Sequence, residues 1–175
     1  MSKLQEFLNL ARAEIGVTED PPGSNRVKYN TAYYGSAVSG DAYAWCVVFI
    51  WWLMRQIGCS DLYYGGKKTA NCSAIWGWAR QNGLIVQEPQ PGDWVLFDWN
   101  ANQSPDHIGV IESSDSQYIN TIEGNVDNCV KRMHRARDNK IVAFIRPAWP
   151  AEPATEYVTK AELRTMLQQA LEYIS

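Results

Sequence analysis

The sequence has few of the features that assign a protein to a broad class at once. Lys and Arg contribute 16 residues against 19 Asp and Glu, a net charge of −3, and basic residues form no run. Binding to nucleic acid through phosphate neutralisation is therefore not expected. No apolar run approaches the roughly 20 residues that a membrane-spanning helix needs, so no membrane partner is expected. Residues 1–16 mix charged and apolar side chains instead of separating them as a secretory signal does, which predicts synthesis in a cytoplasm.

Cysteine and histidine are also scarce. The chain has 4 cysteines and 2 histidines, and no CxxC pair. This set supports neither a zinc site nor a disulfide framework, so we expect reduced thiols and no metal or cofactor. Free cysteine is among the most buried residue types, and we interpret Cys59, Cys72 and Cys129 as structural.

Aromatic residues, in contrast, are abundant. Eight Trp, nine Tyr and four Phe in 175 residues exceed what a single core requires, which hints at an aromatic binding groove. The residues predicted to line it are Tyr33, Tyr34, Trp45 and Trp99. A core position is an equally good interpretation of each of them.

The order of the predicted elements indicates an α+β fold, with helices first and a mostly antiparallel sheet afterwards. Apolar spacing predicts helices over residues 2–16, 45–57 and 69–82, of which the second is apolar almost all round and so buried. Residues 19–40 are rich in Pro, Gly, Asn and Tyr and are interpreted as a long ordered loop. Short β-rich runs separated by turn residues predict strands at residues 94–99, 107–113, 117–122, 130–134 and 142–146.

The C-terminal part has a different composition. Residues 1–147 form the predicted main domain, residues 148–158 are a Pro-rich linker, and residues 159–175 have the apolar stripe of an amphipathic helix. A lone helix of this length is marginal in water, so the stripe must pack on something. Docking on its own domain and pairing with a second copy, as a homo-oligomer, both satisfy that need.

Cys46 stands out because it opens the buried helix in the stretch YAWCVVFIWW. At a helix start, unpaired backbone N–H groups and the helix dipole favour a thiolate. An ordinary thiol is only slightly ionised at neutral pH, whereas one paired with a protonated histidine at a helix N-terminus is largely ionised. Cys46 is thus either a nucleophile or a space-filling core residue.

A nucleophilic thiol needs a base, and only two histidines are available. His107 begins the predicted strand HIGVIES directly after a turn, which places its ring at a strand end. His134 lies among charges in KRMHRAR and is the weaker alternative, since a solvated histidine is the commoner case there.

A third group should orient the imidazole, and hairpin geometry offers one. If SSDS closes a hairpin so that Ser113 pairs with Gln117, His107 faces Glu123 across the strands. Asn125 has the same parity and could approach the ring as well. Glu123 and Asn125 could instead be plain turn residues, and a slip of one residue would turn Glu123 away.

Four segments together, AWCVVFIWW, PGDWVLF, DHIGVIE and TIEGN, resemble the CHAP family of cysteine amidases and endopeptidases. The resemblance covers roughly residues 4–147. It implies a papain-like fold that hydrolyses amide bonds of bacterial peptidoglycan, with Cys46 as nucleophile, His107 as general base and Glu123 or Asn125 as the orienting residue. Since residues 1–16 do not have the pattern of an export signal, we expect a phage or prophage endolysin, made in the host cytoplasm and acting at the cell wall, and a fragment of a larger secreted hydrolase would have the same features.

The sequence departs from the family pattern at two places. Some members bind calcium through two closely spaced aspartates upstream of the cysteine, but NTAYYG stands in that region, so calcium is not supported. Many members carry Gln before the cysteine, whereas Trp45 stands here, and the second oxyanion donor is unassigned. A non-catalytic wall-binding or assembly module on the same fold, and a hydrolase of some other amide, remain alternatives.

Overall fold

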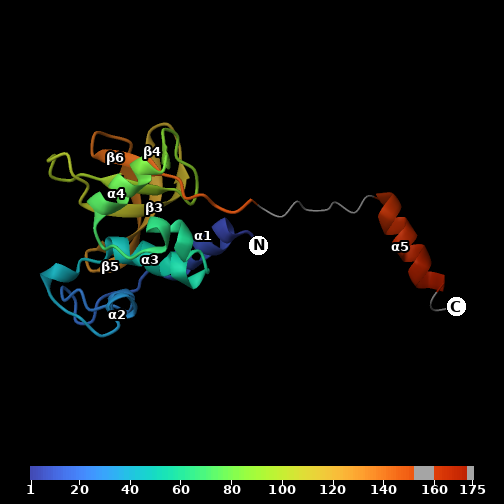
Figure 1. Cartoon of the computed structure of the whole chain (residues 1–175), viewed down its shortest axis with the longest axis horizontal. Coiled ribbons are helices and arrows are strands. Elements are labelled where there is room, and N and C mark those ends of the chain that lie inside the picture. The colour runs from blue at the N-terminus through green and yellow to red at the C-terminus, as the bar shows by residue number, and fades with distance from the viewer. Residues whose placement is uncertain (152–159, 173–175) are drawn as a thin grey trace.

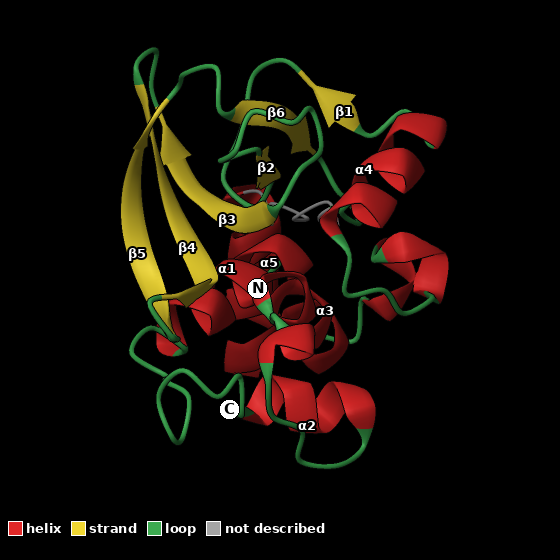
Figure 2. Ribbon diagram, turned by 90° about the vertical axis from the view of Figure 1, so that its left-hand side faces the viewer, coloured by secondary structure: helices red, strands yellow, loops and turns green. Residues whose placement is uncertain are grey.

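The structure is a computed structural model that describes residues 1–151 and 160–172. Its strands form one sheet in the order β1-β6-β2-β3-β4-β5, and every neighbouring pair is antiparallel. Helices α1 to α4 precede the sheet in the chain, and Figure 2 shows α1, α3 and α4 on one side of its curved strands. The α+β class is therefore confirmed.

The elements have the following bounds. The helices are α1 Lys3–Ala13, α2 Lys28–Tyr34, α3 Cys46–Gln56, α4 Cys72–Gln81 and α5 Lys160–Glu172, and the strands are β1 Ile85–Val86, β2 Trp94–Phe97, β3 His107–Ser114, β4 Tyr118–Val126, β5 Cys129–Ala136 and β6 Ile141–Ile145 (Figure 1).

Local sequence explains where the helices begin. The Ser2 side chain accepts a hydrogen bond from the Gln5 backbone N–H at 3.3 Å and caps α1. Asn71 caps α4 in the same way, accepting from the Ala74 N–H at 2.9 Å. By contrast, α3 has no side-chain cap hydrogen bond at its N-cap residue, Trp45. The first N–H groups of α3 are thus not claimed by a capping side chain.

The interpretation of residues 19–40 as a loop is wrong in part, because α2 lies within it. The segment KYNTAYY has no sustained apolar periodicity. Its helix is held instead by tertiary contacts of Tyr29, which is fully buried and packs against Trp45, Phe49 and Trp52 at ring distances of 5.1 to 5.3 Å. Strand β1 was also missed, since two residues carry no alternation.

The two faces of the sheet carry different cores. Strand alternation points Trp94 and Leu96 into the main core with the helices, and Val95 and Phe97 into a second, smaller cluster with Ile111. The main core gathers the buried face of α1 and nearly all of α3. This arrangement fixes the first turn of α3 against the sheet.

The predicted hairpin register is wrong. Ser113 pairs with Asn120 rather than Gln117, and a bulge separates Ile111 from Ser113. Before the bulge Val110 pairs with Ile122. Continued along β3, that register sets Gly109 opposite Glu123, with His107 two residues further along the same face.

Helix α5 exposes its apolar stripe. Leu163, Met166, Leu167 and Leu171 are 52% to 66% exposed. Thr159 and Ile174 of the predicted helix, and most of the predicted linker, lie outside the described residues. What covers the stripe stays a prediction. Within residues 1–151 and 160–172, no helix has the length and apolar character needed to cross a membrane.

Candidate active site

Cys46 is the first residue of α3 and is buried, with 7% of the residue surface exposed. The start of α3 packs directly on the backbone of β4 at Gly124. A Cβ placed on Gly124 would lie 2.7 Å from the Phe49 Cβ and 2.9 Å from Trp45 Cζ3. Only glycine permits this approach, which brings the N-terminus of α3 to the strand that carries Glu123.

His107 is the first residue of β3 and is held by Glu123 of β4. The His107 Nε2 lies 2.9 Å from Glu123 Oε2. This contact occupies Nε2, and the imidazole also lies close enough to the Cys46 thiol for each group to shift the pKa of the other. The structure thus brings three of the predicted site residues into one chain of contacts.

Glycine again makes that contact possible. A Cβ on Gly109 would lie 2.7 Å from Glu123 Cγ and 3.4 Å from its Cδ. The Glu123 side chain therefore lies flat over the Gly109 backbone to reach His107. Gly109 is a site residue that the sequence analysis missed, although HIG is the signal that marks it.

The Glu123 carboxylate is fully buried and fully partnered. The Thr121 hydroxyl donates to Oε1 at 2.5 Å, and Arg135 donates from Nε to Oε1 at 3.0 Å and from Nη2 to Oε2 at 2.7 Å. Burial raises the pKa of Glu123, but the bonds from His107 and Arg135 outweigh it and hold the pKa at about 2. Glu123 is therefore ionised throughout the neutral range.

The Cys46 and His107 pair is charged at neutral pH. Burial lowers the pKa of His107, yet the bonds to Cys46 and Glu123 outweigh burial and raise it to about 9. The pKa of Cys46 lies well below its ordinary value, because the Cys72 thiol, His107 and the Val47 backbone N–H all favour the thiolate against the opposing effect of burial. The resting state is thus a thiolate beside an imidazolium.

Cys72 was interpreted as structural, but it lies against Cys46. Cys72 is the first residue of α4, it is buried, and its thiol interacts with the Cys46 thiol strongly enough to shift the pKa of both groups. The thiolate next to it and burial together raise the pKa of Cys72, so Cys72 stays protonated and donates. All four cysteines are free thiols, and Cys59 is buried as expected.

Asn125, the other predicted orienting residue, does not take that role in the structure. It has a left-handed backbone with φ of 62°, and its amide donates to Asn25 Oδ1 at 3.4 Å. Glu123 makes the contact with His107 instead. His134, the alternative base, is bonded to Asn120 at 2.8 Å and stacks on Tyr118 at 4.4 Å, on the exposed side of β5.

A hollow of about 520 Å³ opens beside His107. Trp99 forms part of its wall, 39% exposed and stacked on Phe97 at 4.6 Å. The residues that line the hollow are Trp99, Asp106, His107, Asn125, Val126, Asp127, Arg135 and Lys140. It offers an extended ligand an aromatic wall next to His107, and Cys46 is not among the residues that line it.

The other predicted groove residues lie elsewhere. Trp45 is 0% exposed and donates from Nε1 to the buried Glu19 at 2.8 Å, so the prediction that it lines a groove is wrong. Tyr33 and Tyr34 lie on α2, where Tyr33 packs edge-on against Trp51 at 4.9 Å. Their role as a binding surface stays a prediction.

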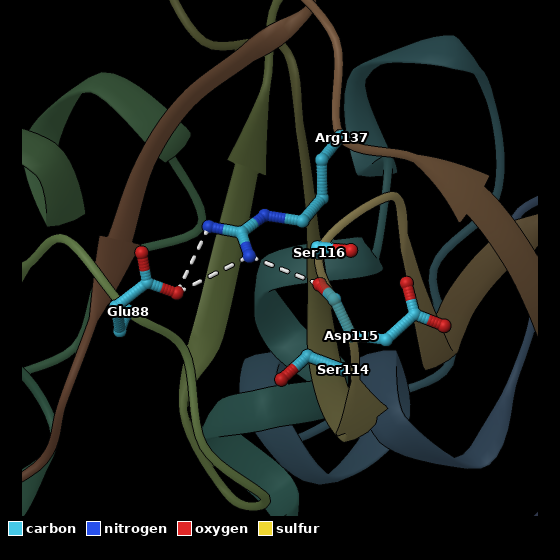
Figure 3. A pocket seen from close by; sticks show the side chains of 5 residues that line it. All are labelled: Glu88, Ser114, Asp115, Ser116 and Arg137. Carbon is cyan, nitrogen blue, oxygen red and sulfur yellow. Dashed lines mark hydrogen bonds and ion pairs between the residues drawn. The ribbon is translucent and has the colours of Figure 1, made fainter.

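A second hollow, of about 480 Å³, lies at the far end of β3. Figure 3 shows Arg137 reaching across it, donating to Glu88 at 3.2 Å and to the Asp115 carbonyl at 3.0 Å, with Ser114 and Ser116 at its edge. Its lining contains no thiol and no imidazole. Among the described residues, no group of three or more His, Cys, Asp or Glu side chains is placed to hold a metal ion.

Comparison with known proteins agrees with this geometry. The model of the CHAP domain matches residues 38–125, half of the sequence, and the chain belongs to the CHAP family. The fold is similar to the crystal structure of Ly7917 (TM-score 0.51, 16% identity) and to that of Ly7917 with the hydrolyzing product of MDP (TM-score 0.53, 18% identity). Each alignment covers 82% of this chain and 62% of the other chain. No curated protein matches the sequence significantly.

Proposed function

We propose that this chain hydrolyses an amide bond of bacterial peptidoglycan, as an N-acetylmuramoyl-L-alanine amidase or an endopeptidase, by a thiol mechanism. The observation that carries the proposal is the contact chain from Cys46 through His107 to Glu123, at the start of a helix and beside an open hollow. Family membership supports it, as does the likeness to a structure whose ligand is named as a hydrolysis product of MDP. The chain spans less than two thirds of that protein.

The first half of the proposed reaction forms a thioester. The Cys46 thiolate attacks the amide carbonyl carbon and a C–S bond forms. The His107 imidazolium then gives its proton to the amide nitrogen, the C–N bond breaks and the amine departs. Because His107 carries a proton at neutral pH, the acid for this step is in place before the substrate binds.

The second half returns the enzyme to its starting state. His107, now neutral, takes a proton from water, the hydroxide oxygen attacks the thioester carbon, and the C–S bond breaks to release a carboxylic acid and the thiolate. The Cys46 backbone N–H is the proposed oxyanion donor, and loss of one such donor typically costs about 100-fold to 1000-fold in rate. None of these steps requires a metal ion.

Substitution of the two reacting groups tests the proposal. Cys46→Ala and His107→Ala should fold and no longer release amines from purified cell walls. Cys129→Ala removes a thiol from β5 that contacts neither group and serves as the matched control, with unchanged release expected. Amine release by Cys46→Ala would refute the hydrolase, and wall binding without release by the wild type would indicate a non-catalytic wall-binding module.

Mass spectrometry of the muropeptide products identifies the bond. A free stem peptide and an intact glycan indicate the amidase, whereas a shortened stem or an opened cross-bridge indicates the endopeptidase. The proposed assignment to a phage endolysin is tested by host-cell lysis on co-expression with a pore-forming membrane protein.

A further inference from the structure

Arg135 of β5 binds both oxygens of the buried Glu123 carboxylate and shares Oε2 with His107. Strand β5 pairs with β4 through Ile119↔Arg135 and Glu123↔Lys131, so the side chains of Arg135 and Glu123 lie on the same face of the sheet. Nε and Nη2 of the guanidinium each donate to a different carboxylate oxygen, at 3.0 and 2.7 Å. This two-pronged geometry fixes both the position and the rotation of the Glu123 carboxylate.

The other face of the guanidinium packs on aromatic rings. Its Cζ lies 4.9 Å from the centre of the Trp99 ring and 5.7 Å from that of Phe97. These rings restrict Arg135 and leave its side chain only 23% exposed. Trp99 and Arg135 both line the hollow beside His107, so Arg135 connects the wall of the hollow to the carboxylate that contacts the imidazole.

The other charged groups around Arg135 have partners of their own or lie at its edge. Asp106 accepts hydrogen bonds from the Trp99 backbone N–H at 3.2 Å, and Asp127 pairs with Lys131 at 2.6 Å. Lys140 lies over Trp99 at 5.7 Å. Asp138 and His134 line the small hollow on the other side of Arg135. Among the described residues, the cationic partners that bond to Glu123 are therefore Arg135 and His107.

The reaction makes this second cation necessary. When His107 gives its proton to the departing amine, it becomes neutral, and Glu123 would be left as a buried carboxylate without a cationic partner. A buried unpaired charge is so unfavourable that the group takes up a proton instead. A protonated Glu123 could turn its O–H toward the imidazole and would no longer hold the ring by an ionic bond. Arg135 prevents this because its guanidinium stays charged at every working pH.

We infer that Arg135 is a positioning residue of the proposed hydrolase, which keeps Glu123 ionised and aimed at His107 while the imidazole alternates between its charged and neutral forms. The inference rests on the proposed function for the change in the charge of His107, and on the two hydrogen bonds from Arg135 for the position of the carboxylate.

The pH dependence of Cys46 alkylation by a neutral haloacetamide measures this role without any wall substrate. The rate changes once as the thiolate–imidazolium pair forms and again as His107 loses its proton. Arg135→Gln removes one cation from the cluster, so each remaining group should bind its proton more tightly. Both midpoints should move to higher pH, by roughly half a pH unit or more for a charge this close and partly screened.

Two further variants separate charge from geometry. Arg135→Lys keeps the charge but cannot donate two parallel hydrogen bonds to the carboxylate. The alkylation midpoints of this variant should therefore stay in place, while its hydrolysis rate falls at every pH. Arg132→Gln removes a cation from the same strand whose partner is Glu112, and serves as the control for net charge. Its alkylation midpoints should match those of the wild type.

The alkylation and hydrolysis measurements decide whether Arg135 has this positioning role. Arg135→Gln midpoints equal to those of Arg132→Gln would overturn the inference. Should Arg135→Gln fail to fold, judged by its thermal unfolding, Arg135→Lys carries the test, and a wall-hydrolysis rate of Arg135→Lys equal to that of the wild type at every pH overturns the inference. Wall hydrolysis that survives in Cys46→Ala would instead refute the proposed function, so the two failures are distinguishable.

Discussion

Gly109→Ala should damage the site without touching any reacting group. The new Cβ would lie 2.7 Å from Glu123 Cγ, closer than such atoms approach one another, and 3.4 Å from Glu123 Cδ, which is an ordinary contact. Glu123 cannot simply swing aside, because Thr121, His107 and Arg135 all hold its oxygens. Either the strands separate locally or the carboxylate leaves His107.

The expected size of the effect follows from these alternatives. Forcing an extra methyl group into a packed site costs typically about 1 to 3 kcal/mol, and a hydrogen bond to a charged group contributes about 1.5 to 3 kcal/mol. We expect the free energy of unfolding to fall by about 2 kcal/mol. If a similar amount of His107 orientation is lost in the transition state, the rate falls roughly 30-fold, since each 1.36 kcal/mol is a factor of ten.

Urea unfolding measures the first quantity and amine release from purified walls measures the second. Gly77→Ala is the matched control, because a Cβ at Gly77 in α4 meets nothing within 4 Å. Alanine is also the better helix former, so the control should be as stable as the wild type or more so. Wild-type stability and rate in Gly109→Ala would refute the reasoning that glycine is required for Glu123 to reach His107.

Three further predictions concern the same site. Cys72→Ala removes the thiol donor to the thiolate, so alkylation of Cys46 should need a higher pH, and Cys72→Ser should restore it; identical profiles for all three proteins would contradict the role given to Cys72. The depressed pKa of Glu123, about 2 against an ordinary 4.5, gives stability that is present above pH 4.5 and lost as the pH falls toward 2. The melting temperature of the wild type should therefore exceed that of Glu123→Gln by less and less as the pH falls from 4.5 toward 2. A difference that stays constant over this pH range would exclude the proposed effect of Glu123 ionisation on stability. Chelation with EDTA should leave wall hydrolysis unchanged, whereas a loss that calcium restores would show a metal requirement.

Much of the fold could be predicted because its patterns are local. The buried helix α3 follows from its all-round apolar sequence, and the strands β2 to β6 follow from short β-rich runs between turns. The register of β3 against β4 could not be predicted, because it depends on a bulge between Ile111 and Ser113 that no residue type in this segment predicts. Helix α2 was missed because the buried contacts of Tyr29, rather than any periodicity, hold it in place.

In the candidate site, too, the residues marked by local sequence could be predicted and the contacts made only by tertiary packing could not. Cys46 and His107 could be singled out from their places at a helix start and a strand start, and Glu123 from its parity with His107. The contact between Cys46 and Cys72 could not, because it joins the first residues of two helices whose packing is a tertiary result. Arg135 likewise reaches Glu123 only through the pairing of β4 with β5.

The central claim is that Cys46 is a thiolate stabilised by His107, and the pH dependence of its alkylation in the wild type and in His107→Ala tests that claim most directly. Peptide mass spectrometry separates Cys46 from the partly exposed Cys129. The wild type should react readily well below neutral pH, and His107→Ala should react only as the pH approaches the ordinary range of a thiol. The same profile in both proteins, or a wild-type Cys46 that does not react below neutral pH, would contradict the account.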